Sequence, residues 1–271
     1  TFGTMATGGF STHTASIAAF DSRFIHYVII FFMFVAGTNF ALHFRLLKGK
    51  PGFYWKSREF RVYVGLIVIF ALVLFINNLI HQQFNSAEEA FRQSLFHVTS
   101  IMTTTGFGAA DWELWGGFAQ VLFVSLMLIG GMAGSTGGGI KVVRIIIVFR
   151  QIIVELKRLI HPQAVLPLRI GHMLVDDGIV RNVLSFTLAF MMILLISTAV
   201  ISAFDIDMVT SFGASLACLS NIGPGLGDVG PVDDYGHLPS IVKWILVMLM
   251  MLGRLEVFTV MVLFSRHFWR K

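Results

Sequence analysis

The sequence predicts an all-α membrane protein built from repeated modules, each with a membrane-spanning helix, a short helix that ends in a loop, and a second membrane-spanning helix. Composition is the first indication, because 13% of the residues are charged and 56% are hydrophobic, whereas soluble domains carry about 25% charged residues. The second is a glycine-containing motif that occurs three times, each time after a short amphipathic segment and before a long apolar one. The third is a strong bias in where the charged residues fall.

The three copies of the motif are ATGGFS at 6–11, TTTGFG at 103–108 and NIGPGLG at 221–227. We align their glycines at Gly8, Gly106 and Gly223. Intervals of roughly 100 residues are too long for a solenoid or a propeller blade, but they suit two membrane-spanning helices around a re-entrant hairpin. Such a module is typical of a cation pore.

Hydropathy and helix-start signals place the elements of the first half. Spans are predicted from Phe24 to Leu47 and from Phe60 to Gln83, each long enough to cross roughly 30 Å of hydrocarbon at about 1.5 Å per residue. The segment from Ala87 to Thr103 follows Ser86, a good helix start, and has an acidic first turn. It is too polar to face lipid, so we expect a short helix that leads into the second motif.

The second half repeats this order with one interruption. The apolar run from Trp112 to Ile129 is broken by GGMAGSTGGG at 130–139, and helical character resumes from Ile140 to Ile160. After a polar linker, the pattern predicts a span, a short amphipathic helix and a last span, which cover Ile179 to Ala203, Ile206 to Ser220, and Ser240 to Phe268.

Charge placement tests this topology. Most of the 20 Lys and Arg residues lie between Arg45 and Arg61, between Lys141 and Arg181, or at the C-terminus, whereas most of the 15 acidic residues lie on the side of the glycine motifs. By the positive-inside rule the motifs open to the outside and the basic loops face the cytoplasm. An acidic outer vestibule would concentrate cations. The chain begins inside the segment that leads to the first motif, so we expect that the N-terminal part of the protein is missing.

The chemistry follows from what a cation needs in order to leave water. Oxygens must replace its hydration shell, and rings of backbone carbonyls do so when short loops converge on an axis. Glycine lets such loops turn their carbonyls inward and leaves the path free of side chains. The alternative is that these glycines only permit close helix packing. We expect a K⁺ filter at Thr7, Gly8, Thr105, Gly106, Ile222 and Gly223, with threonine hydroxyls as further ligands, supported by Ala6, Gly9, Thr104, Phe107, Gly108, Asn221, Pro224 and Gly225.

Six stretches in order carry a family resemblance: ATGGFSTH, TTTGFG, GGMAGSTGGGIK, RLIHPQAV, NIGPGLG and GRLEVF. With them the chain resembles the Trk/Ktr/HKT superfamily of potassium transporters, and within it the bacterial TrkH-type membrane subunits. The resemblance covers almost all 271 residues and implies four repeats around one pseudo-fourfold cation pore. It implies that 1–58 is the end of the second repeat, 59–177 the third and 178–271 the fourth, with the first absent. Ile222 departs from Thr7 and Thr105, which lowers the symmetry of the filter.

The glycine-rich segment resembles the intramembrane gating loop of that family. A break that faced lipid would leave backbone groups unsatisfied, so it must face the pore. A plain kink and a phosphate-binding loop are the alternatives, although GSTGGGIK does not match P-loop spacing. Arg254, roughly 21 Å into the last span, is a second gating candidate or a structural staple, and Glu256 faces elsewhere. The expected gating residues are Gly130, Gly131, Gly134, Ser135, Thr136, Gly137, Gly138, Gly139, Lys141 and Arg254.

These features predict the pore-forming subunit of a potassium uptake system in a bacterial inner membrane, with K⁺ as the transported ion. We expect no covalent chemistry, no covalent cofactor and no nucleic acid, and a packing or hydrogen-bonding role for His97. The resemblance implies a homodimer with a cytosolic nucleotide-binding regulatory subunit. An ion-coupled symporter with alternating access, also typical of broken helices, and a non-conducting fragment are the alternatives.

Overall fold

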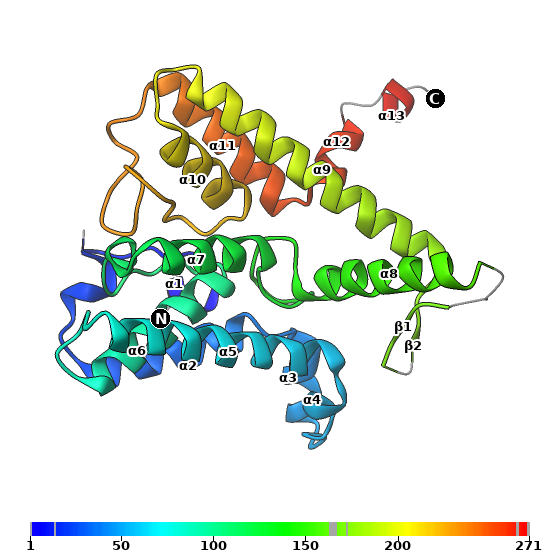
Figure 1. The fold of residues 1–271 in the computed structure, drawn as a ribbon, viewed down its shortest axis with the longest axis horizontal. Coiled ribbons are helices and arrows are strands. Elements are labelled where there is room, and N and C mark those ends of the chain that lie inside the picture. The colour runs from blue at the N-terminus through cyan, green and yellow to red at the C-terminus, as the bar shows by residue number, and fades with distance from the viewer. Residues whose placement is uncertain (1, 14, 163–166, 172, 264–265, 270–271) are drawn as a thin grey trace.

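The computed structural model describes residues 2–13, 15–162, 167–171, 173–263 and 266–269. This part of the chain is mostly helical, with one short antiparallel hairpin of β1 (Arg169–Ile170) and β2 (Met173–Leu174). In Figure 1, α5 (Arg58–Ile80), α7 (Gly117–Ile129) and α8 (Val142–Ile160) run along the long axis of the molecule, and α9 (Asp177–Ser202) and α11 (Ser240–Arg254) lie obliquely above them. The predicted all-helical fold is confirmed.

The N-terminal part is broken where the sequence predicts one span. Its elements are α1 (Phe2–Met5), η1 (Ser16–Ala19), α2 (Arg23–Ala36), α3 (Phe40–Leu47) and α4 (Phe53–Lys56).

The two apolar helices α2 and α3 meet at 99°, so the predicted uninterrupted span from Phe24 to Leu47 is wrong. The Asn39 side chain starts α3 by accepting from the Ala41 N–H at 2.8 Å, and the Phe40 N–H donates to the Gly134 carbonyl at 3.0 Å. A hydrogen bond from the distant glycine segment therefore helps to hold the bend.

The third module forms as predicted. It contains α5, α6 (Ala87–Met102), η2 (Trp112–Trp115), α7 and α8. Ser86 accepts from the Glu89 N–H at 3.1 Å and so caps α6. Helix α6 packs between α2 and α5 and buries most of its length, which explains how a polar short helix sits inside a membrane protein.

The last module has an unexpected break. It contains α9, α10 (Met208–Leu219), α11, α12 (Val257–Leu263) and α13 (Arg266–Trp269). Helix α10 packs between α9 and α11, as α6 does between its neighbours. Helix α11 stops at Arg254, and Glu256 takes a left-handed conformation with φ 61°, so the predicted single span from Ser240 to Phe268 is wrong.

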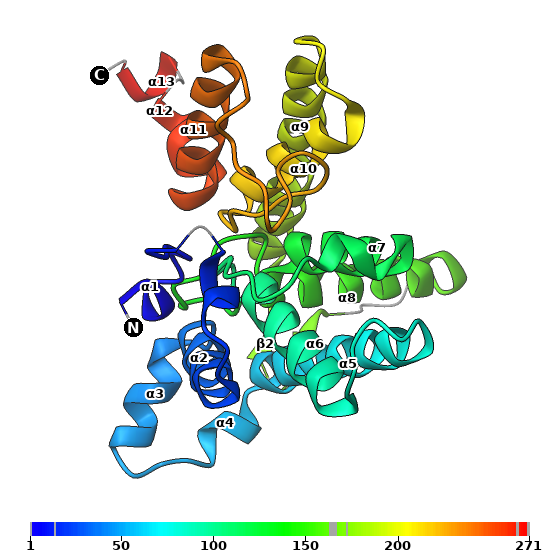
Figure 2. The ribbon, with the colours of Figure 1, turned by 90° about the vertical axis from the view of Figure 1, so that its left-hand side faces the viewer.

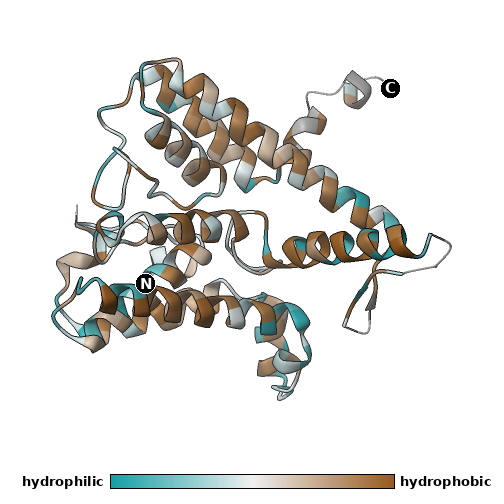
Figure 3. Ribbon diagram, in the orientation of Figure 1, coloured by the Kyte–Doolittle hydropathy of each residue, from teal (hydrophilic) through white to brown (hydrophobic). Residues whose placement is uncertain are grey.

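Polar segments lie at the two ends of the long axis, and apolar helices lie between them. Helices α5 and α9 are long and apolar enough to cross a membrane, and the bent pair α2 and α3 is a third candidate. The α3–α4 segment, the hairpin and the end of α8 lie at one end of the molecule, whereas the loops that follow the three motifs lie at the other (Figure 1). Apolar helices fill the space between these ends (Figure 3). The basic segments thus share one end, as the predicted topology requires.

Candidate functional site

The three short helices α1, α6 and α10 end in the same turn. In each, a residue in the left-handed region donates its N–H to the carbonyl three residues back, and the next residue donates to the carbonyl five residues back. The left-handed residues are Thr7 (φ 49°), Thr104 (φ 57°) and Asn221 (φ 57°). Glycine usually occupies this position, so two β-branched threonines here indicate a backbone that tertiary contacts impose.

These turns correct the alignment of the first motif. Two residues after each left-handed residue comes a glycine with positive φ, which is Gly9 (φ 65°), Gly106 (φ 79°) or Gly223 (φ 111°). Gly8 instead corresponds to Thr105 and Ile222, so the alignment of Gly8 with Gly106 and Gly223 predicted from the sequence is wrong. The sequence offers the same register, because Gly9 precedes Phe10 as Gly106 precedes Phe107, and the hydrogen bonds that end the short helices agree with it.

The three equivalent glycines converge on one place. Figure 2 looks from the end that carries the motif loops and places α1, α6 and α10 around a common centre. Gly9, Gly106 and Gly223 line a single cavity of about 260 Å³ there, with Asp233 and Tyr235 at its edge. Three chain segments roughly 100 residues apart therefore meet at one axis.

Neighbouring loops contact each other in a repeated way. A Cβ on Gly9 would clash with the Thr105 carbonyl, and a Cβ on Gly106 would clash with the Ile222 carbonyl. At Gly223 no described atom lies within 4 Å of the same position. Gly223 instead borders a larger cavity of about 570 Å³, which Thr7 and Arg254 also line. Around the axis the first loop therefore contacts the second and the second contacts the third. The cavity of about 570 Å³ lies between the third loop and the first.

Side chains from outside the motifs hold these loops. The Ser100 hydroxyl donates to the Phe107 carbonyl at 2.8 Å, and the Tyr235 hydroxyl donates to the Gly223 carbonyl at 2.6 Å. Loss of surrounding water raises the pKa of Tyr235, so its phenol remains a donor at neutral pH. Sequence reasoning missed Tyr235, because a single tyrosine in a loop carries no periodic signal.

The glycine segment 130–139 lies directly beneath all three turns. The Thr7 hydroxyl donates to the Thr136 carbonyl at 2.9 Å, and the Gly138 N–H donates to the Thr104 hydroxyl at 2.7 Å. A Cβ on Gly138 would clash with the Ser220 carbonyl, at the end of the third short helix. The segment therefore faces the three turns, and its expected role in gating stays a prediction.

Both threonine hydroxyls that we expected to face an ion have protein partners. That of Thr7 bonds the glycine segment, and that of Thr105 lies 2.8 Å from the hydroxyl of Thr103. Thr104, which we expected only to support the filter, matches Thr7 in position and also bonds the glycine segment. The oxygens left to face the axis are therefore mainly backbone carbonyls.

The opposite edge of the glycine segment is fastened to the break between α2 and α3 and to α5. The Met132 N–H donates to the Gly37 carbonyl at 3.0 Å, and the Ala133 N–H donates to the Glu59 carboxylate at 2.7 Å. The Ser135 hydroxyl donates to the Met132 carbonyl at 2.6 Å. A non-helical segment at membrane depth needs such partners, because lipid offers none.

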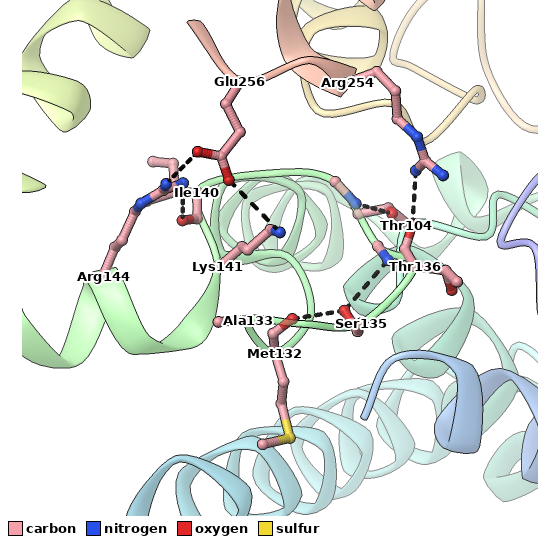
Figure 4. A network of polar contacts seen from close by, with 12 residues as sticks. Thr104, Met132, Ala133, Ser135, Thr136, Ile140, Lys141, Arg144, Arg254 and Glu256 are labelled. Carbon is pink, nitrogen blue, oxygen red and sulfur yellow. Dashed lines mark hydrogen bonds and ion pairs between the residues drawn. The ribbon is translucent and has the colours of Figure 1, made fainter. Parts of the chain in front are cut away.

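Arg254 reaches the glycine segment. Its Nη1 donates to the Thr136 carbonyl at 2.7 Å, and Figure 4 shows the guanidinium pointing down onto the segment. Thr136 therefore accepts from both Thr7 and Arg254. Arg254 is the last residue of α11 rather than the middle of a continuous helix, so it can turn toward the axis.

Glu256, in the break between α11 and α12, forms ion pairs with the start of α8. Its carboxylate lies 2.8 Å from Nη2 of Arg144 and 3.9 Å from Nζ of Lys141, at the start of α8 (Figure 4). The Arg144 guanidinium also stacks on the ring of Phe186 of α9, 4.0 Å from its centre. A cavity of about 230 Å³ beneath the glycine segment is lined by Lys141, Glu256 and Arg254. The sequence-based statement that Glu256 does not pair with Arg254 is confirmed, and Arg144 is a residue that it missed.

A smaller expectation, the role of His97, also has an outcome. His97 accepts the N–H groups of Ala109 and Ala110 at 3.2 Å and bonds the Gln93 carbonyl at 2.9 Å, which confirms its hydrogen-bonding role. Cys218 is buried and unbridged. The described residues include no group of three or more His, Cys, Asp or Glu that could hold a metal ion.

Comparisons with known proteins agree with this geometry. The family model TrkH, described as cation transport protein, matches residues 1–271. The chain is 42% identical to the Trk system potassium uptake protein TrkH of Salmonella typhimurium over 100% of this chain and 56% of that protein. It is 32% identical to TrkI of Halomonas elongata over 98% of this chain and 54% of that protein. The crystal structure of the potassium transporter TrkH from Vibrio parahaemolyticus superposes with a TM-score of 0.94 and 39% identity, over 99% of this chain and 58% of that one. The chain spans little more than half the length of these relatives.

Proposed function

Since the chain belongs to the TrkH family of cation transport proteins, we propose that it forms most of the ion pathway of a potassium uptake protein in a bacterial inner membrane. The observation that carries this proposal is the convergence of three equivalent turns on one cavity, with the glycine segment bonded beneath them. The relatives are named as potassium uptake proteins, which supports K⁺ as the ion that crosses.

The filter consists of the backbone at and after the three turns. Its carbonyls come from Thr7 to Gly9, Thr104 to Gly106, and Asn221 to Gly223, where the loops contact one another closely. A fourth loop of the same build has room in the cavity between Gly223 and Thr7. With that loop in place, four sets of carbonyls would surround the ion.

The glycine segment and Arg254 form the gate. The segment crosses the axis directly under the filter, and its hydrogen bonds to Thr7 and Thr104 hold it there. Arg254 adds a positive charge on the same path and a third hydrogen bond to the segment. Opening requires these bonds to break or the segment to move aside.

The motif end faces outside and the basic end faces the cytoplasm. The gathering of the basic segments at one end supports this orientation. Cysteines placed at Asp233 and Lys50, with Cys218 replaced, should be labelled from opposite sides by an impermeant thiol reagent, Asp233 from outside. Labelling of both from one side would overturn the orientation. The same basic end offers a surface to a cytosolic nucleotide-binding regulatory subunit, in a homodimer of pore subunits.

The test of the filter uses the full-length protein that contains this sequence, reconstituted in vesicles. Gly106→Ser should reduce the preference for K⁺ over Na⁺, because a Cβ there meets the Ile222 carbonyl. Gly65→Ser is the matched control, since a Cβ on Gly65 of α5 has no described atom within 4 Å. Unchanged selectivity in the Gly106 variant, with normal folding, would remove this loop from the filter.

The breaks in the inner helices also suit an alternating-access symporter, because such transporters bind ions where helices are interrupted. Potassium flux at equal pH on both sides, with a pH dye inside the vesicles, separates the two mechanisms. A pore moves K⁺ without a matching proton current. A fixed ratio of protons to K⁺ would favour the symporter.

A further inference from the structure

A groove of about 820 Å³ runs between α5 and α8 and opens on the outer surface of the molecule. In Figure 1 the right-hand end of α5 lies below the start of α8, and the hairpin lies next to the end of α8. Apolar side chains form the walls of the groove, and they are Val62, Leu66 and Phe70 of α5 and Ile145, Phe149 and Ile153 of α8. Phe149 is 65% exposed and Ile153 is 53% exposed, so this wall is uncovered in the chain. The groove therefore offers an apolar surface of the kind that lipid tails cover.

Four cations line this groove together with its apolar residues. They come from three elements, Arg58 from the first turn of α5, Arg150 and Lys157 from α8, and Arg169 from β1. No carboxylate of the described residues lies within ion-pairing distance of any of the four, and no acidic residue lines the groove. Their neighbours Lys141, Arg144 and Arg158 all have carboxylate partners. The four charges therefore lack a counter-ion from the described protein.

Helix α8 is suited to lie at the surface of a membrane. Leu156, Leu159 and Ile160 continue its exposed apolar face beyond Ile153, while Lys157 and Arg158 lie among them. A helix with an apolar face and basic residues near its end places that face in the acyl region and the cations at headgroup level. The groove thus combines a tail-binding wall with a headgroup-binding mouth.

We propose that this groove binds one anionic phospholipid from the leaflet at the basic end of the molecule. Its phosphate lies among Arg58, Arg150, Lys157 and Arg169, and one acyl chain lies along the walls between α5 and α8. Basic pockets between membrane helices select anionic headgroups in this way, and arginine suits phosphate because its guanidinium offers two parallel donors. The apolar walls distinguish this ligand from a free phosphate, which would gain nothing from them.

The experiment is native mass spectrometry of the full-length protein with equal amounts of dioleoyl phosphatidylglycerol and dioleoyl phosphatidylcholine. The natural protein should retain the anionic lipid preferentially. A variant with Gln at positions 58, 150, 157 and 169 should lose this preference by at least about tenfold, since each surface cation contributes severalfold to anionic lipid binding. The single change Arg150→Gln should reduce it by about fivefold if the combined variant folds poorly. The matched control replaces Arg45, Lys48, Lys50 and Lys56, four cations of the same end that do not line the groove.

Four further outcomes would overturn the proposal. Equal losses in the groove variant and the control would mean that only net charge matters. Leu66→Trp fills the groove and leaves the cations in place, so unchanged lipid retention in that variant would exclude the walls as a tail site. Competition by glycerol phosphate at the same concentration as the lipid would point to a free anion. A loss of dimers in the Leu66 variant with unchanged lipid binding would assign the groove to a second copy of the chain.

Discussion

Replacing Arg254 by alanine should increase potassium flux. Among the described residues, its guanidinium has one hydrogen bond, from Nη1 to the Thr136 carbonyl at 2.7 Å. A hydrogen bond with a charged donor contributes about 1.5–3 kcal/mol, and the exposure of this side chain places it near the lower end. A loss of about 1.5 kcal/mol from the closed state shifts the closed-to-open ratio about tenfold, so flux should rise by up to about tenfold.

The assay is K⁺ flux into vesicles that contain the full-length protein, normalised to the amount of folded protein. Arg254→Lys is the matched control, because lysine keeps the positive charge but lacks the planar guanidinium group. Thr104→Val tests the same gate from the other side, since it removes the acceptor of the Gly138 N–H. Both changes release one segment, so the double variant should gain less than the sum of the two single effects.

Two results would refute this reasoning. If flux in Arg254→Ala falls in proportion to lost protein, Arg254 is a structural staple and the gate lies elsewhere. If the Arg254 and Thr104 effects add fully, the two residues do not act on a common barrier.

Three more predictions follow from other contacts. Gly9→Ala should impair K⁺ selectivity much more than Gly8→Ala in flux assays, because Gly9 has φ 65° and faces the Thr105 carbonyl; equal effects would refute the corrected alignment. Tyr235→Phe should lower K⁺ over Na⁺ selectivity about threefold to tenfold, since the lost hydrogen bond is worth about 0.5–1.5 kcal/mol; an unchanged ratio would show that this bond does not shape the filter. Glu113 accepts from the Gly227 N–H at 2.8 Å, and desolvation raises its pKa in the folded protein. The protonated side chain therefore contributes to the stability of the fold. This contribution is complete below the ordinary glutamate pKa and is lost as pH rises through the raised value. The melting temperature of Glu113→Gln, measured relative to that of the natural protein, should therefore be higher at pH 8 than at pH 4. An equal difference between the two proteins at both pH values would contradict the assignment.

Much of the fold could be predicted because local signals and tertiary packing agree. Ser86 caps α6 as its position before an acidic turn indicates, and α5 and α9 coincide closely with the predicted spans. The break at 130–139 was visible because glycine is costly in a helix. The breaks after α2 and after α11 were not predicted, although Gly-Thr-Asn at 37–39 and Gly-Arg-Leu-Glu at 253–256 interrupt the apolar runs there, because so short an interruption hardly lowers the hydropathy averaged over a whole span.

The sequence indicated which segments form the candidate site, and the structure changed which glycine of the first motif corresponds to Gly106 and Gly223. Glycines, threonines and Arg254 pointed to segments that the structure brings together, because few other residue types suit close backbone approach or a charge at membrane depth. Their partners could not be predicted. Tyr235, Arg144 and the Glu256 ion pairs join residues far apart in the chain, and no local pattern encodes such a meeting.

By itself, the sequence determined that this chain is a membrane protein of repeated modules, where most helices begin, and which end carries the basic residues. These properties depend on hydropathy, helix capping and charge, which act over a few neighbouring residues. Only the tertiary structure decided that the three motif turns meet at one cavity, and that the glycine segment bonds Thr7, Thr104 and Arg254 at once. The physical reason is that a hydrogen bond depends on the positions of two atoms in space, and these segments meet only when the whole chain has folded.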